Sequence, residues 1–118
     1  MSKNKRILSI SNEPNLAASR ALALGNAGHQ VTSAAGRTHG EQAIAGGEFD
    51  VLVLCHTLAS EEAIALTHAF RKVNPSAKVL AVATGWFIVV RADRVVQMTD
   101  GPFALLSAIH DLDDDLDD

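Results

Sequence analysis

The sequence has very few of the residues on which several protein classes depend. It contains one cysteine, Cys55, which excludes an internal disulfide framework and a multi-cysteine zinc site and favours a reducing compartment. Aromatic residues make up 4% and tyrosine is absent, which counts against a stacking surface for single-stranded nucleic acid. No apolar run approaches the roughly 18 residues of a membrane span, and no signal-like core follows the basic start. We therefore expect a cytoplasmic protein with no membrane association.

Charge is distributed unevenly along the chain. The formal net charge is -4, yet residues 111–118 hold six of the 14 acidic residues. The remainder has eight acidic against ten basic residues, and the basic ones are scattered rather than gathered in a stripe. This pattern argues against nucleic-acid binding. We expect one domain over residues 1–110 and an acidic, solvated C-terminal tail over residues 111–118.

Strand and helix patterns alternate along the chain. Apolar runs typical of buried strands span residues 6–10, 30–34, 49–54, 78–83 and 94–98. Helical patterns follow them, starting near residues 14, 38, 60 and 102. This alternation predicts an α/β fold, a doubly wound five-stranded parallel sheet with helices on both faces.

Three helix details are specific predictions. Leu22 and Leu24 are assigned to the inward surface of the first helix. Thr38 and Glu41 have capping-box spacing, which places the start of the second helix at Thr38. Ser60 is predicted to cap the third helix.

The link between the fourth and fifth strands is unusually short. Thr84–Asp93 has ten residues, which is near the minimum for a parallel crossover with its helix. The fourth helix should therefore be shortened or absent. The alternative is a hairpin in which residues 88–90 pair with residues 95–96.

Three motifs at strand ends point to one family. They are Arg6-Ile-Leu-Ser-Ile-Ser-Asn-Glu-Pro14, Phe49-Asp-Val-Leu-Val-Leu-Cys55 and Ala92-Asp-Arg-Val-Val-Gln-Met98. In their order and spacing they resemble the receiver domain of bacterial response regulators, over nearly the whole chain. The resemblance implies a flavodoxin/receiver-like sheet with strand order 2-1-3-4-5.

The resemblance also implies a phosphorylation pocket, and this chain departs from it. Receivers hold Mg²⁺ with an acidic pair after strand one, accept phosphate on an aspartate ending strand three, and carry a lysine ending strand five. The acidic pair corresponds here to Ser11 and Asn12, the aspartate to Cys55 and the lysine to Met98. Cys55 has no carboxylate, so no acyl phosphate can form on it, and Met98 has no cation to meet a phosphate.

Two further pocket positions retain suitable groups only with a shift of one residue. The hydroxyl that receivers keep after strand four is present as Thr84, and Glu13 takes an acidic position if the first register slips by one. The degenerate pocket thus comprises Ser11, Asn12, Glu13, Cys55, Thr84 and Met98. We expect a pseudo-receiver with no cofactor and no catalytic residue.

Other site classes lack their motifs. The five histidines show no ligand spacing, so no metal site is predicted, and neither phosphate-binding glycine pattern occurs. His56 follows Cys55 directly, and because adjacent strand residues point to opposite faces, no base is expected beside the thiol. Cys55 is then a buried, inert thiol or, as the alternative, a redox-sensitive one.

The apolar run of residues 86–90 holds the only tryptophan and suggests a contact surface. It occupies the place where receivers have an amphipathic helix, and it is either buried or exposed to a partner. The candidate interface residues are Trp86, Phe87, Ile88, Val90, Arg91 and Arg94. We expect a phosphorylation-independent protein in bacterial signalling or regulation. It should act through contact with a protein partner, either another protein or a second copy of this chain.

Overall fold

The computed structural model describes residues 5–83, 92–97 and 104–110, and these form a parallel sheet with helices on both faces. The sheet has five strands in the order β2-β1-β3-β4-β5, and all neighbouring strands are parallel. Both the parallel sheet and the strand order 2-1-3-4-5 were expected, and the structure confirms them. The elements are β1 (Arg6–Ser11), α1 (Pro14–Asn26), β2 (Gln30–Ala35), α2 (Gly36–Gly46), β3 (Val51–Leu54), α3 (Ser60–Val73), β4 (Lys78–Ala83) and β5 (Arg94–Gln97). Residues 104–110 are also helical.

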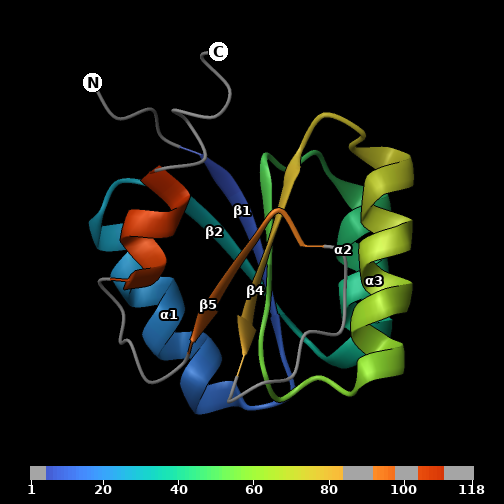
Figure 1. Ribbon diagram of the computed structural model, residues 1–118, viewed down its shortest axis with the longest axis horizontal. Coiled ribbons are helices and arrows are strands. Elements are labelled where there is room, and N and C mark those ends of the chain that lie inside the picture. Colours follow the sequence, from blue (N-terminus) through green and yellow to red (C-terminus); the bar gives the residue numbers. More distant parts are fainter. Residues whose placement is uncertain (1–4, 84–91, 98–103, 111–118) are drawn as a thin grey trace.

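The helices cover the sheet in two layers (Figure 1). α2 and α3 lie on one face, while α1 and the helix of residues 104–110 lie on the other. Each layer encloses its own core of fully buried side chains. Leu52 of β3 packs with Leu66 and Phe70 of α3 on the first face, whereas Val53 packs with Leu24 of α1 on the second. Because neighbouring β3 residues serve opposite cores, the strand reads as a continuous apolar run.

Two helix predictions fail for reasons of local geometry. Leu22 is 67% exposed whereas Leu24 is fully buried, because positions two apart on a helix are about 200° apart and cannot both face the sheet. α2 begins at Gly36 rather than Thr38. Gly36 has a φ of 79°, which lets the chain turn directly from β2 into the helix. Glu41, which was expected to take part in a capping box with Thr38, instead pairs with Arg37, whose Nε lies 2.6 Å from its carboxylate.

The third helix is also capped differently from the prediction. Its N-cap residue is Ala59, and Ser60 is the first helical residue. Glu62 supplies the cap, since its Oε1 accepts the backbone N–H of Ala59 at 2.9 Å. The boundary shifts by one residue because this carboxylate reaches back over the first turn.

Asp93 anchors the start of β5 to β4 and α3. Its backbone N–H donates to Val79 O at 2.8 Å, and its Oδ2 accepts the Val79 N–H at 2.7 Å. The same carboxylate lies 3.5 Å from Arg71 of α3. β5 pairs with β4 as a parallel neighbour.

The first arm of the alternative hairpin, residues 88–90, and the question of a fourth helix lie outside the described residues, as does the tail of residues 111–118.

The buried serines of β1 give a direct test of how polar groups are tolerated in this core. Ser9 and Ser11 are each 1% exposed and share one face of the strand, but Ser9 Oγ has no hydrogen-bond partner among the described residues, while Ser11 Oγ has three. Ser9→Ala should raise the free energy of unfolding by about 1 kcal/mol, because it removes a desolvated hydroxyl. Ser11→Ala should lower it by about the same amount, and urea denaturation measures both. Equal effects of the two substitutions would contradict this account.

Candidate functional site

Pairing between β1 and β3 places Ser11 beside Cys55. The register runs from Ile7↔Val51 to Ile10↔Leu54, and the Cys55 N–H donates to Ile10 O at 3.0 Å just beyond the strand end. These groups lie at the carboxyl edge of the sheet, where functional crevices of doubly wound folds form. The chain geometry therefore brings Ser11 and Cys55 together at this edge.

Cys55 is buried but has two nitrogen-containing side chains close to its sulfur. The residue is 4% exposed. Arg20 of α1 donates from Nη1 to Cys55 Sγ at 2.8 Å, and His56 Nδ1 lies 3.6 Å from the same sulfur. The expectation that His56 points away is wrong, because β3 ends at Leu54 and strand alternation no longer applies at Cys55.

The surroundings of Cys55 favour its thiolate. Burial alone raises the pKa of the thiol, but hydrogen bonding by Ser11, Thr57 and Arg20 outweighs it and holds the pKa below the ordinary value. The pKa of His56 is lowered by burial and by the charge of Arg20. A neutral imidazole and a guanidinium therefore flank a thiol with increased thiolate character.

Asn12 cross-links the loops that follow β1 and β3. Its Nδ2 donates to Thr57 O and to Glu62 Oε1, each at 3.1 Å, and its backbone N–H donates to Thr57 Oγ1 at 2.9 Å. Because Thr57 O and Glu62 Oε1 are both acceptors, they fix the amide with nitrogen inward. Thr57 Oγ1 also lies 3.2 Å from Ser11 Oγ. The pocket is thus closed by its own hydrogen bonds.

The donor set does not fit the Mg²⁺ that receivers hold. Mg²⁺ requires hard oxygen ligands at near-octahedral positions. Here an amide nitrogen, rather than an oxygen, faces Thr57 O and Glu62 Oε1. Within residues 5–83, 92–97 and 104–110, no group of three His, Cys, Asp or Glu side chains could hold a metal ion.

The remaining predicted residues fall at the margin of the site or outside the description. Glu13 is the N-cap of α1, where its Oε1 accepts the Asn15 N–H at 3.2 Å. Arg94 lies in β5, at the opposite end of the strand from the pocket. The rest lie outside the described residues: Thr84, Trp86, Phe87, Ile88, Val90, Arg91 and Met98.

Three contributors to the site were not predicted from the sequence, namely Arg20, Thr57 and Glu62. Arg20 could have been identified from the sequence, because it is the only charged residue of α1 and lies among the positions of the inward helix repeat. Glu62 could also have been identified, because an acidic residue at the third position of a helix can reach back to the cap. Thr57 could not, since its role depends on the loop conformation.

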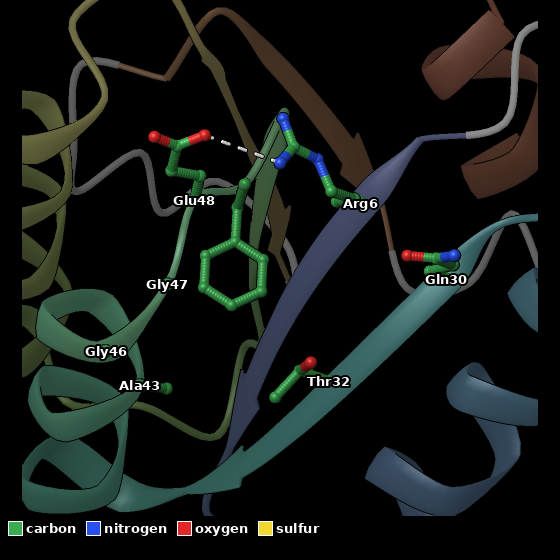
Figure 2. A pocket seen from close by; sticks show the side chains of 8 residues that line it. Arg6, Gln30, Thr32, Ala43, Gly46, Gly47 and Glu48 are labelled. Carbon is green, nitrogen blue, oxygen red and sulfur yellow. Dashed lines mark ion pairs between the residues drawn. The ribbon is translucent and has the colours of Figure 1, made fainter.

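A separate surface hollow lies at the other end of the sheet (Figure 2). It has a volume of about 430 Å³ and is bordered by Gln30 and Thr32 of β2, by Phe49 and by the C-terminal end of α2. Arg6 lines it and is paired with Glu48 at 3.6 Å. Because these residues lie toward the amino ends of the strands, this hollow is distinct from the Cys55 pocket.

Comparison with known proteins supports one conclusion about architecture. No protein-family model matches the chain, and no curated protein sequence matches it. Among solved structures, a CheY-like receiver domain from Methanospirillum hungatei is 23% identical with a TM-score of 0.82, over 96% of each chain. The chain has a receiver fold.

Two further receiver structures show the same likeness. Chemotaxis response regulator CheY4 of Vibrio cholerae is 16% identical with a TM-score of 0.79, over 91% of this chain and 97% of that one. A response regulator from Burkholderia pseudomallei, which contains a phosphorylated aspartic acid and a calcium ion, is 18% identical with a TM-score of 0.76, over 89% of this chain and 66% of that one. Identities at this level establish the receiver fold, and no helix in the described part of this chain could span a membrane.

Asn12 offers a test of the internal closure of this receiver-fold pocket. Asn12→Asp places a carboxylate against Thr57 O and Glu62, so we expect a loss of about 1 kcal/mol of unfolding free energy at pH 7. The repulsion raises the pKa of a carboxyl group in the folded state, so stability lost at pH 7 should return as the pH falls toward about 4. Asn12→Ala is the control, because it removes the amide without adding charge, and its deficit should depend on pH less than that of Asn12→Asp. Thermal melts at several pH values measure the difference.

Proposed function

We propose that this chain is a pseudo-receiver that acts in the cytoplasm, in bacterial signalling or regulation, through protein contact and without aspartyl phosphorylation. The receiver fold supports a role in signalling. The finer proposal depends on the chemistry of the pocket, in which Cys55 stands where receivers carry the acceptor aspartate. No residue is assigned a catalytic role.

The Asn12 amide is the observation that carries this proposal. Its Nδ2 satisfies Thr57 O and Glu62 Oε1 together, so these oxygens need no cation. A cation would have to displace a side chain that belongs to the folded structure. This arrangement supports a domain whose output depends on a partner rather than on Mg²⁺ and phosphate.

The contact surface that we propose is the segment from Trp86 to Arg94 together with the start of the last helix. Of the described residues, Arg94 and Val95 belong to β5 at one edge of the sheet, and Val95 is 37% exposed. The partner is a protein, and no nucleic acid or membrane is involved in the proposed role.

Beryllofluoride, which mimics an acyl phosphate, tests the loss of phosphorylation. Addition of Mg²⁺ and then beryllofluoride should leave both the melting temperature and the Trp86 fluorescence unchanged, because Cys55 stands in place of the acceptor aspartate and the described pocket residues do not fit Mg²⁺. A receiver domain that keeps its acceptor aspartate serves as the positive control. A saturable, Mg²⁺-dependent shift in this chain would overturn the pseudo-receiver proposal.

A thiol redox switch at Cys55 is the second candidate, and the Arg20 contact favours it. A guanidinium 2.8 Å from Sγ stabilises the thiolate, which is the reactive form of cysteine. In this reaction the thiolate attacks one oxygen of hydrogen peroxide, the O–O bond breaks, and the departing hydroxide takes a proton from water or buffer. Sulfur is oxidised by two electrons to a sulfenic acid, and the peroxide is reduced to water.

Alkylation of Cys55 by iodoacetamide separates a reactive thiol from an inert one. If the switch operates, the folded protein should be modified with a pH midpoint below that of an ordinary thiol. Arg20→Met should raise this midpoint by removing the donor and charge, whereas Arg20→Lys should raise it less. Mass spectrometry follows the modification. Protection of Cys55 until denaturant is added would eliminate the redox role.

A further inference from the structure

Strand β2 is an edge of the sheet, and its outward backbone groups have no partner among the described residues. It is the terminal strand, paired only with β1 in the described sheet. The Gln30 N–H donates to Lys5 O at 2.9 Å, so Gln30 and Thr32 direct their backbone groups toward β1. In a parallel pair the intervening residues direct theirs the other way. Val31 and Ser33 therefore present N–H and C=O groups away from the sheet.

This edge lacks the devices that usually protect exposed strands. Its sequence, Gln-Val-Thr-Ser-Ala-Ala, contains no charged residue and no proline. Val31 and Ala34 pack against the two helix layers, but Thr32 on one face and Ser33 on the other are both exposed. Gly28 and Gly36 flank it with φ values of 99° and 79°, and the chain turns away at each end.

We propose that two copies of this chain associate through β2, pairing antiparallel about a two-fold axis at Thr32 and joining their sheets into one. Only an extended strand matches the alternating outward groups, and β2 is complementary to itself. Val31 would exchange both backbone hydrogen bonds with Ser33 of the partner subunit, and Ser33 with the partner's Val31. The two Thr32 side chains would meet at the axis, where a Thr–Thr pair is favourable.

This interface is independent of the one under the proposed function. It uses the sheet edge formed by β2, whereas the segment from Trp86 to Arg94 leads into β5 at the other edge. The molecule would therefore keep the β5 side available for a different partner while the β2 side holds the second copy.

Charge substitutions at Thr32 test the two-fold axis itself. Sedimentation velocity at increasing concentration should show a monomer–dimer equilibrium for the wild type. Thr32→Lys and Thr32→Glu should each be monomeric, because like charges lie directly opposite at the axis. An equimolar mixture of the two variants should dimerise again, and Thr32→Ser should behave as the wild type. Circular dichroism melts confirm that each variant is folded.

Substitution of the outward N–H tests the hydrogen bonds. Ser33→Pro should raise the dimer dissociation constant at least about tenfold, since it removes one donor per copy, and an edge strand tolerates proline at an outward N–H. Ser33→Ala is the matched control and should leave the constant unchanged. A wild type that stays monomeric, a Thr32→Lys variant that still dimerises, or a mixture that does not associate would each overturn the proposal.

Discussion

The pairing of β1 with β3 is the constraint on which the rest of the molecule depends. β1 lies between β2 and β3, and five of its six residues are buried. Because the register is fixed by side chains that serve two cores at once, a shift by one residue would place each core's side chains on the wrong face. The same register sets Ser11 next to Cys55 and brings Asn12 within reach of Thr57. The geometry of the pocket is thus a consequence of how the sheet is packed.

The pocket shows how a receiver fold can remain ordered without an ion. Loops after parallel strands carry unpaired carbonyls and helix-start N–H groups, and these must be satisfied wherever they are removed from water. Here the Asn12 amide takes Thr57 O and one oxygen of Glu62, and that oxygen also takes the Ala59 N–H. Carboxylates and a cation could satisfy similar loops, but only with a ligand bound. Amide closure makes the ordered state a property of the chain alone.

The sequence carries enough information for the sheet but not for the side-chain contacts of the site. The five strands and the position of Cys55 follow from apolar runs, which respond to burial on both faces. The strand order was implied by the resemblance to receivers. The start of α2 and the outward position of Leu22 were missed because helix ends and helix phase depend on one or two local contacts. His56 was misjudged because the chain leaves strand geometry one residue earlier than assumed. The network around Asn12 depends on loop conformation, for which no periodicity exists.

Asp93 has a consequence for how this protein can change over evolutionary time. It binds Val79 through both backbone and side chain, so β5 is attached to β4 by contacts that do not involve the chain between Ala83 and Ala92. The entropy of closing a loop changes slowly with its length, by about 0.6 kcal/mol for each doubling. A change in the length of that connection therefore costs little loop-closure entropy. Selection can rewrite it to fit a new partner while the sheet, the thiol pocket and the β2 edge are inherited unaltered.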